Sequence, residues 1–251
     1  MTGDRLLLVF AHPDDESFTA GGTIAKYAAQ GVDIHLLVAT RGEAGKTADY
    51  CMIEELGAFR ESETLDAAKV LGINKVNFLG YRDKELSKAD PLEVSLKIAQ
   101  YIRKFRPQVV ITFGPDGSSG HQDHKAIHYY TVAALGLAKN PEIEGLGDEP
   151  CEVFRLYYAG FPSKVRLALG RTEFLGPEPN FIIDTTAFVD SKLAAMQCHR
   201  TQSGSLNKFK SMGEDKLAYF MNQEYFRLAE EYSSGSISGG TDLFAEKNAA
   251  K

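Results

Sequence analysis

The chain has 251 residues, of which 43% are hydrophobic, and this length is ample for one large globular domain. The composition is ordinary for a folded protein and excludes a disordered or fibrous chain. Lysine and arginine number 28 against 34 aspartates and glutamates, so the formal net charge is -6. This acidic balance argues against a nucleic-acid-binding surface. The apolar runs are far shorter than the ~20 residues of a membrane span.

The N-terminus and the cysteines indicate the compartment. Residues 1–4 lead directly into an apolar stretch, without the basic and small-residue regions of a signal peptide. Cys51, Cys151 and Cys198 are odd in number, widely separated and outside any CxxC pair. We therefore expect a cytoplasmic protein whose cysteines stay reduced and inert.

Two periodicities alternate along the first 135 residues. Short runs rich in valine, isoleucine and leucine predict buried strands at 5–10, 33–39, 75–80 and 108–113. Apolar residues at helical spacing predict helices at 23–30, 53–71, 92–105 and 125–137. This alternation predicts right-handed crossovers and a single-domain, Rossmann-like α/β fold. Its mostly parallel sheet would carry helices on both faces.

The second half of the chain gives weaker signals. Further strands are predicted at 154–159 and 181–184, and helices at 186–202 and 215–231. The segment 162–179 mixes proline, glycine and basic residues without a clear period, which indicates a surface flap. The stretch 233–240 is rich in serine and glycine. We therefore expect one domain over residues 1–232 and a C-terminal tail over 233–251.

An acidic cluster follows the first predicted strand. Residues 11–16 read Ala-His-Pro-Asp-Asp-Glu, where a dinucleotide-binding fold would carry Gly-x-Gly-x-x-Gly. Three neighbouring carboxylates repel one another, and a divalent cation is the simplest way to neutralise them. The alternative is an acidic first turn of a helix, with Asp14 as its N-cap.

A second cluster follows the fourth predicted strand. After a glycine-rich loop at 114–120, His121 and His124 are spaced to lie on one side of a starting helix. In a sheet with strand order 3-2-1-4, the first and fourth strands are neighbours, and ligands bind outside their carboxyl ends. Both clusters fall at those ends. Their convergence predicts a metal site rather than helix capping and chance.

The residue types suggest a role for each member of these clusters. His12, Asp15 and His124 supply two imidazoles and one carboxylate, which suits Zn²⁺ with open positions, although Fe²⁺ uses the same donors. Asp14 would then lie beside the metal as a general base. His121 would lie across the site, where it could stabilise an oxyanion or protonate a leaving group.

The carboxylate between the two histidines has two interpretations of similar weight. Asp123 could orient a histidine from behind the metal site, or it could cap the helix that starts there.

These motifs resemble the zinc-dependent N-acetylglucosaminyl deacetylases of the PIG-L/LmbE family. The resemblance rests on the Ala-His-Pro-Asp-Asp-Glu block and on Gly-His-Gln-Asp-His at 120–124. It extends through 60–73, 80–83, Lys192 and 199–202, and so covers about residues 5 to 202. It implies zinc ligation by His12, Asp15 and His124, with Asp14 as the general base and His121 as the oxyanion or acid partner.

The resemblance also implies substrate contacts. Arg60 and Asp83 would contact sugar hydroxyls near the rim, and His199 would lie close to the site. Each has a plainer interpretation: Arg60 as a solvated helix charge, Asp83 as a turn former and His199 as a core histidine.

The implied activity is zinc-dependent removal of the acetyl group from a small N-acetylglucosamine-containing molecule. A thiol-precursor glycoside of the GlcNAc-malate or GlcNAc-inositol type is the preferred substrate, and family members often form homo-oligomers. The alternatives are a non-catalytic metal- or sugar-binding module and a non-haem Fe(II) oxygenase, although oxygenase sites usually lie inside β-barrels.

The segment 42–47 resembles the end of a P-loop, but Thr40 replaces the required first glycine.

Overall fold

The computed structural model describes residues 3–168, 178–211, 217, 220–229 and 240–245. Within these residues one sheet has seven strands in the order β3-β2-β1-β4-β5-β7-β6. All neighbouring pairs from β3 to β5 are parallel, whereas β7 runs antiparallel to both β5 and β6. The strands are β1 (Arg5–Phe10), β2 (Asp33–Thr40), β3 (Lys75–Tyr81), β4 (Val109–Phe113), β5 (Arg155–Ala159), β6 (Phe181–Asp184) and β7 (Gln223–Leu228).

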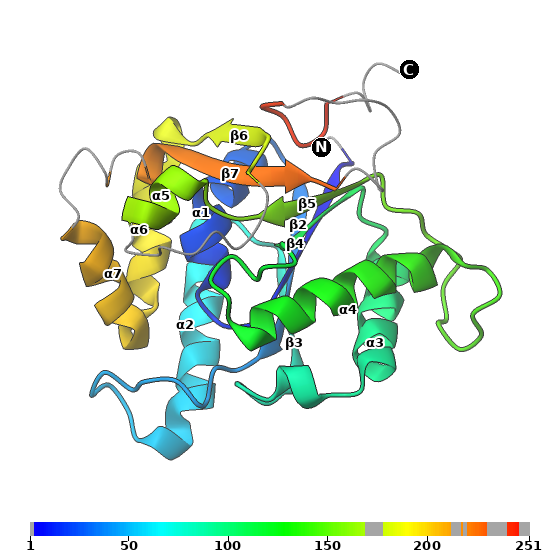
Figure 1. The fold of residues 1–251 in the computed structure, drawn as a ribbon, viewed down its shortest axis with the longest axis horizontal. Helices are drawn as coiled ribbons and strands as arrows, with labels where there is room; N and C mark the ends of the chain where they lie inside the picture. Colours follow the sequence, from blue (N-terminus) through cyan, green and yellow to red (C-terminus); the bar gives the residue numbers. More distant parts are fainter. Residues whose placement is uncertain (1–2, 169–177, 212–216, 218–219, 230–239, 246–251) are drawn as a thin grey trace.

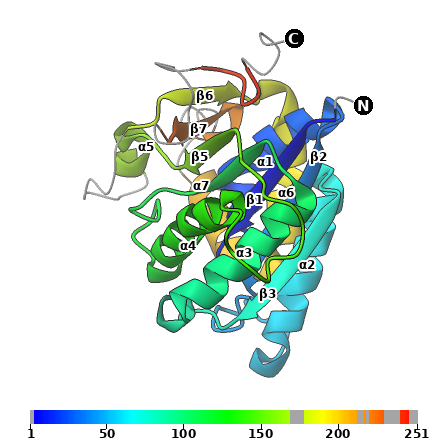
Figure 2. The same ribbon diagram turned by 90° about the vertical axis from the view of Figure 1, so that its right-hand side faces the viewer.

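Helices cover both faces of the sheet. One face is covered by α1, α2 and α6, and the other by α3 and α4 (Figures 1 and 2). This arrangement confirms the predicted α/β fold with helices on both faces and the strand order 3-2-1-4. The helices are α1 (Asp15–Ala29), α2 (Leu56–Leu71), α3 (Pro91–Phe105), α4 (Gln122–Lys139), α5 (Ser163–Ala168), α6 (Val189–Cys198) and α7 (Ser203–Lys210). Four short 3₁₀ turns are η1 (Ile53–Glu55), η2 (Leu86–Lys88), η3 (Thr186–Phe188) and η4 (Arg200–Gln202).

The burial of the central strands explains why the strands of the N-terminal half could be predicted from the sequence. Leu8 of β1 pairs with Leu36 of β2 on one side and with Ile111 of β4 on the other, and all three are fully buried. A strand covered on both faces must be apolar at every position, which gives the continuous runs seen in the sequence. The register places the carboxyl ends of β1 and β4 side by side.

Two predicted helices are wrong in part. The segment 215–231 contains the strand β7, which pairs with both β5 and β6. Its apolar side chains fit a helical spacing, but the free edge of β5 offers a hydrogen-bonding partner, and tertiary pairing decides. The segment 186–202 forms η3, α6 and η4, because the chain leaves the helix at His199, where φ is -81° and ψ is 65°.

The C-terminal residues that the structure describes belong to the domain. Gly240 bridges to Phe181 of β6, and the side chains of Leu243 and Phe244 lie in the core. The Leu243 amide donates to the Tyr27 hydroxyl of α1 at 2.6 Å. Within the expected tail, residues 240–245 thus pack against the domain and bury apolar side chains, which the serine- and glycine-rich stretch before them does not indicate.

Two other expectations concern surface segments. Within the predicted flap at 162–179, the structure has the short helix α5, and residues 169–177 lie outside the described part. Among the described residues, no helix combines the length and the apolarity that crossing a bilayer requires.

Candidate active site

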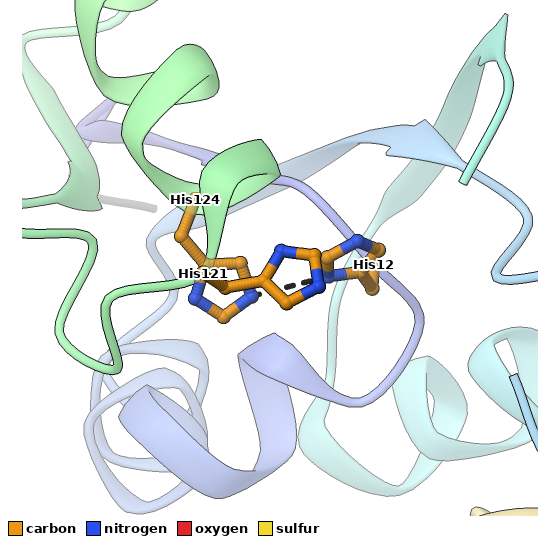
Figure 3. Close-up of side chains that lie close together, drawn as sticks. All are labelled: His12, His121 and His124. Atoms are coloured by element: carbon orange, nitrogen blue, oxygen red, sulfur yellow. Dashed lines mark hydrogen bonds between the residues drawn. The ribbon is translucent and has the colours of Figure 1, made fainter. Parts of the chain in front are cut away.

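The two clusters predicted from the sequence meet at the carboxyl edge of the sheet. His12 follows the end of β1, and the loop after β4 leads to α4, which begins at its N-cap His121 and carries His124 in its first turn. Figure 3 shows the imidazoles of His121 and His124, from the start of α4, beside that of His12. The site therefore depends on the adjacency of β1 and β4.

The donor atoms of three side chains form a small triangle, in which each imidazole faces a different oxygen of Asp15. His12 Nδ1 lies 3.1 Å from His124 Nε2, which lies 3.4 Å from Asp15 Oδ1, and His12 Nδ1 lies 3.7 Å from Asp15 Oδ2. In a tetrahedral site with bonds of ~2.0–2.1 Å, neighbouring ligand atoms lie ~3.3–3.4 Å apart. These three side chains could therefore hold a divalent cation with little movement.

The outer nitrogens of the two histidines fix which nitrogens face inward. His12 Nε2 lies 3.1 Å from Asp83 Oδ1 and 3.2 Å from Asp123 Oδ2, and His124 Nδ1 lies 3.0 Å from the Gly117 carbonyl. Each of these nitrogens donates its proton to an oxygen. In the neutral rings, His12 Nδ1 and His124 Nε2 then direct lone pairs at the same point, as metal-binding histidines do.

The electrostatics of the cluster also favour a cation. Burial disfavours a charged imidazole, but hydrogen bonds to Asp123 and Asp83 outweigh it and raise the pKa of His12 to about 10. Burial, with the help of His12, lowers the pKa of His124 well below its ordinary value. Burial raises the pKa of Asp15 to about 6. The carboxylates around His12 thus favour a positive charge: without a cation they keep the His12 ring protonated, and a bound divalent cation would replace that proton on Nδ1. His124 is already neutral and able to ligate.

Asp14 occupies a strained position between β1 and α1. Its φ is 100°, in the left-handed region that residues other than glycine rarely adopt, and its side chain caps no helix N–H. Strain of this kind is kept mainly at functional sites. Burial raises the pKa of Asp14 to about 7, although Arg60 opposes the shift. A carboxyl with such a pKa can both accept and return a proton near neutral pH.

His121 has the properties of a neutral hydrogen-bond donor. It is the N-cap of α4, and its Nδ1 accepts the backbone N–H of Asp123 at 3.2 Å. The neutral ring therefore carries its proton on Nε2. Burial and the nearby His12 lower the pKa of His121, which keeps the ring neutral. This N–H could donate to a developing oxyanion.

These side chains share one cavity. Its volume of about 340 Å³ lies in the range of small-molecule sites. The wall combines the predicted catalytic and metal-binding residues with the three phenylalanine rings of Phe18, Phe113 and Phe161. It includes His12, Asp14, Asp15, Arg60, Asp83, Lys84, Phe113, His121, His124 and Phe161.

The sequence matches a known family of deacetylases. Residues 7–135 match the family described as GlcNAc-PI de-N-acetylase. A 1D-myo-inositol 2-acetamido-2-deoxy-alpha-D-glucopyranoside deacetylase of Rhodococcus jostii is 35% identical over 80% of this chain and 82% of its own length. The corresponding deacetylase of Streptomyces scabiei is 31% identical over 96% of this chain and 89% of its own length. The chain belongs to the GlcNAc-PI de-N-acetylase family.

The fold of this family member agrees with that assignment. An N,N'-diacetylchitobiose deacetylase from Pyrococcus horikoshii superposes with a TM-score of 0.75 over 91% of this chain and 84% of that chain. The sequences are 24% identical, so this likeness shows a shared fold. The family assignment itself rests on the sequence matches, which identify the chain as an N-deacetylase.

Arg60 of this family member lies deeper than the predicted rim. Its guanidinium donates to the Pro13 carbonyl and, at 3.1 Å, to the Gly42 carbonyl, and it lies 3.5 Å from Asp14 Oδ2. At Gly42 φ is 66°, and an added Cβ would lie 2.1 Å from Arg60 Nη1, so a side chain there would strain the backbone and displace the guanidinium. Arg60 lines the cavity, but its contacts hold Asp14 and two loops together.

Asp83 and His199 both lie close to the site, as expected, but both are buried. Asp83 is 7% exposed, and it contacts His12 through Oδ1 and accepts the Ala44 N–H through Oδ2 at 3.2 Å. His199 is absent from the described cavity wall and lies behind Asp14, 2.8 Å from Glu16 Oε1. Their burial was not predicted, because a sequence gives no direct measure of how deeply a polar side chain is buried.

The sequence analysis assigned no individual role to Glu16. It is fully buried, yet the sequence showed it only as the last acidic member of a cluster. A carboxylate at the second position of a helix is usually solvated, and only its distant partner His199 marks it as different. A burial estimate combined with co-varying partners could have found it.

One prediction concerns the carboxylate behind His12. We expect Asp123→Asn to weaken zinc binding by ~10–100-fold, because a neutral amide holds the His12 N–H less strongly. Zinc affinity is measured by competition with a chelator. Asp90→Asn, at the N-cap of α3, is the matched control and should leave the affinity unchanged. Equal affinities for Asp123→Asn and wild type would show that this contact does not tune the site.

Proposed function

We propose that this N-deacetylase uses a divalent metal to hydrolyse the acetamide of a small N-acetylglucosaminide. The observation that carries the proposal is the convergence of His12, Asp15 and His124 donor atoms within 3.1–3.7 Å beside Asp14 and His121. The names of the Rhodococcus and Streptomyces relatives support a 2-acetamido-glucoside as the substrate.

Zn²⁺ is the proposed metal. Two imidazoles and one carboxylate leave room for substrate and water in a tetrahedral or five-coordinate site, and Fe²⁺ remains the second candidate because it uses the same donors. Bound there, the metal would polarise the acetamide carbonyl and make water more acidic.

The side chains then divide the proton transfers between them. Asp14 accepts a proton from the attacking water, whose oxygen bonds to the carbonyl carbon. His121 keeps its proton and donates a hydrogen bond from Nε2–H to the carbonyl oxygen as negative charge develops there. The protonated Asp14 passes its proton to the amine nitrogen as the C–N bond breaks. Water and amide are thereby converted to acetic acid and an amine, which exchange one proton to give acetate and an ammonium group, and Asp14 returns to its starting state.

The test is a paired product assay. Zinc-loaded protein is incubated with a panel of N-acetylglucosaminides, and acetate and free amine are both quantified. We expect equal amounts of the two products. Binding of these glycosides without acetate release would instead support a non-catalytic sugar-binding module, and would contradict the proposal.

We also propose a cytoplasmic location and a homo-oligomeric state. The free thiols of Cys51, Cys151 and Cys198 support a reducing compartment. The side chains of Tyr50 and Met52 are 49% and 68% exposed, and such apolar surface supports self-association. Sedimentation velocity tests the second proposal, and a concentration-independent monomer would contradict it.

A further inference from the structure

A second cavity adjoins the candidate active site. It has a volume of about 950 Å³ and shares Gly45, Lys84, Gln202 and Ser205 with the first cavity. Its walls come from the loop after β2 and from the segment that starts α7. The segment 42–47, which resembled part of a P-loop, supplies much of the first wall.

The charged side chains that line the second cavity are all basic. Lys46 and Lys84 line it, the other polar side chains are hydroxyls, amides and one thiol, and none of its described lining residues is acidic. This contrasts with the first cavity, where carboxylates surround His12. A ligand that spans both cavities would therefore meet positive charge as it leaves the metal-binding cluster.

Lys84 is held in place at the junction of the two cavities. Its φ is 64°, its backbone N–H donates to Asp123 Oδ2 at 2.7 Å, and its ammonium donates to the Ala44 carbonyl at 2.5 Å. Because hydrogen bonds already hold both the backbone and the ammonium of Lys84, its side chain loses little conformational entropy when it binds an anion. The strained backbone again indicates a functional position.

We propose that the second cavity binds the aglycone and that Lys84, with help from Lys46, selects an aglycone carrying an anionic group. This inference rests on the proposed function, and it favours a carboxylate- or phosphate-bearing aglycone over a neutral polyol. The shared chemistry is an anion a short distance beyond the glycosidic bond.

Binding tests the subsite separately from turnover. Zinc-loaded Asp14→Asn protein is titrated with N-acetylglucosaminides of malate, of a phosphate-bearing alcohol and of inositol. We expect at least one anionic glycoside to bind about 10-fold more tightly than the inositol glycoside, and added salt to reduce the difference. Which of the two binds identifies the anion.

The lysine variants decide the role of Lys84. Lys84→Met should remove the preference, Lys46→Met should reduce it, and Lys88→Met, an exposed lysine on η2, should preserve it. Equal affinities for charged and neutral glycosides in the Lys84-containing protein would overturn the proposal and leave the deacetylase activity untouched. Absence of acetate release by wild type would instead contradict the proposed function.

A second, independent inference concerns the backbone of Asp14. Glu16 Oε2 accepts the Asp14 N–H at 3.2 Å, and Glu16 Oε1 accepts from the Ser17 hydroxyl at 2.6 Å and lies 2.8 Å from His199 Nε2. The side chains of Glu16 and His199 are both fully buried. His199 reaches this point from the end of α6, 183 residues further along the chain.

Glu16 and His199 lie next to the strained backbone of Asp14. Asp14 adopts a φ of 100°, and the hydrogen bond from its own N–H is one of the contacts that hold it there. A buried carboxylate needs an opposite charge or several donors, and His199 and Ser17 supply them. We infer that Glu16 and His199 are positioning residues that orient the carboxylate of Asp14 toward the substrate.

The inference is tested with a double-mutant cycle. Glu16→Met removes both acceptors at similar length, and we expect kcat to fall ~10–100-fold with KM and zinc stoichiometry nearly unchanged. Glu16→Gln keeps an acceptor for the Asp14 N–H and should restore most of kcat. In the Asp14→Asn background, Glu16→Met should cost nothing further, because there is no base left to orient.

The control is a similar buried carboxylate that reaches α1 from β7. Glu224 accepts the backbone N–H groups of Gly22 and Thr23 and pairs with Lys192 at 2.8 Å. Glu224→Met should lower the melting temperature but act independently of Asp14. If Glu16→Met does not fold, Ser17→Ala should give the same pattern at smaller amplitude. Additive effects of Glu16 or Ser17 changes and Asp14→Asn would overturn the inference.

Discussion

Asp14→Asn is expected to keep the bound metal and to lose ~10²–10⁴ in kcat. Asp14 lies outside the triangle formed by His12, Asp15 and His124, and its Oδ2 is 3.5 Å from Arg60. Asparagine preserves the size of the side chain but cannot accept the proton of the attacking water. Metal content is measured by mass spectrometry and kcat by acetate release.

A substitution of the neighbouring Asp15 serves as the comparison for Asp14→Asn. Asp15→Asn makes the same chemical change one residue further along, but it removes a charged donor from the triangle, so the metal should be lost together with activity. An Asp14→Asn protein with full turnover would show that another group serves as the base. Loss of metal from Asp14→Asn would place Asp14 among the ligands.

His124→Ala is expected to abolish stoichiometric metal binding and, with it, acetate release. It removes one of three donors and leaves His12 and Asp15, which cannot enclose a cation by themselves. The loss should exceed the ~10–100-fold effect of an outer contact such as Asp123. Metal per chain is measured after dialysis against metal-free buffer.

The ring of His124 also stacks on Phe113, with centroids 4.1 Å apart, so stability must be followed in parallel. His35→Ala is the control, because His35 stacks on Phe105 at 3.6 Å on a different part of the sheet. Both variants lose a stacked imidazole, but only His124→Ala should lose metal. A dialysed His124→Ala protein that keeps one zinc per chain would contradict the proposed ligand set.

The sequence predicted the centre of the fold and the meeting of the two clusters for the same physical reason. Parallel strands buried on both faces, such as β1 and β4, are apolar throughout, and their carboxyl ends must open at one edge. His12 and His124 therefore could be placed together although 111 residues separate them. The tautomers that leave their inner nitrogens free depend on Asp123 and Gly117, and only the structure provides those contacts.

The remaining residues could not be placed because their positions depend on tertiary contacts. Arg60 was predicted to contact sugar hydroxyls, with a solvated helix charge as the alternative, and only its contacts with Pro13 and Gly42 show that it is buried. β7 reads as a helix because its edge partners lie elsewhere in the chain. His199 reads as a substrate contact, whereas it lies behind Asp14 against Glu16.

The central claim is that a single metal bound by His12, Asp15 and His124 makes this chain an N-acetylglucosaminide deacetylase. The most direct measurement is acetate release while zinc is titrated into chelator-treated protein. Activity is expected to be absent at the start and to rise linearly to a plateau at one zinc per chain. Acetate release that is independent of added metal, or a plateau that persists in His124→Ala, would contradict the account.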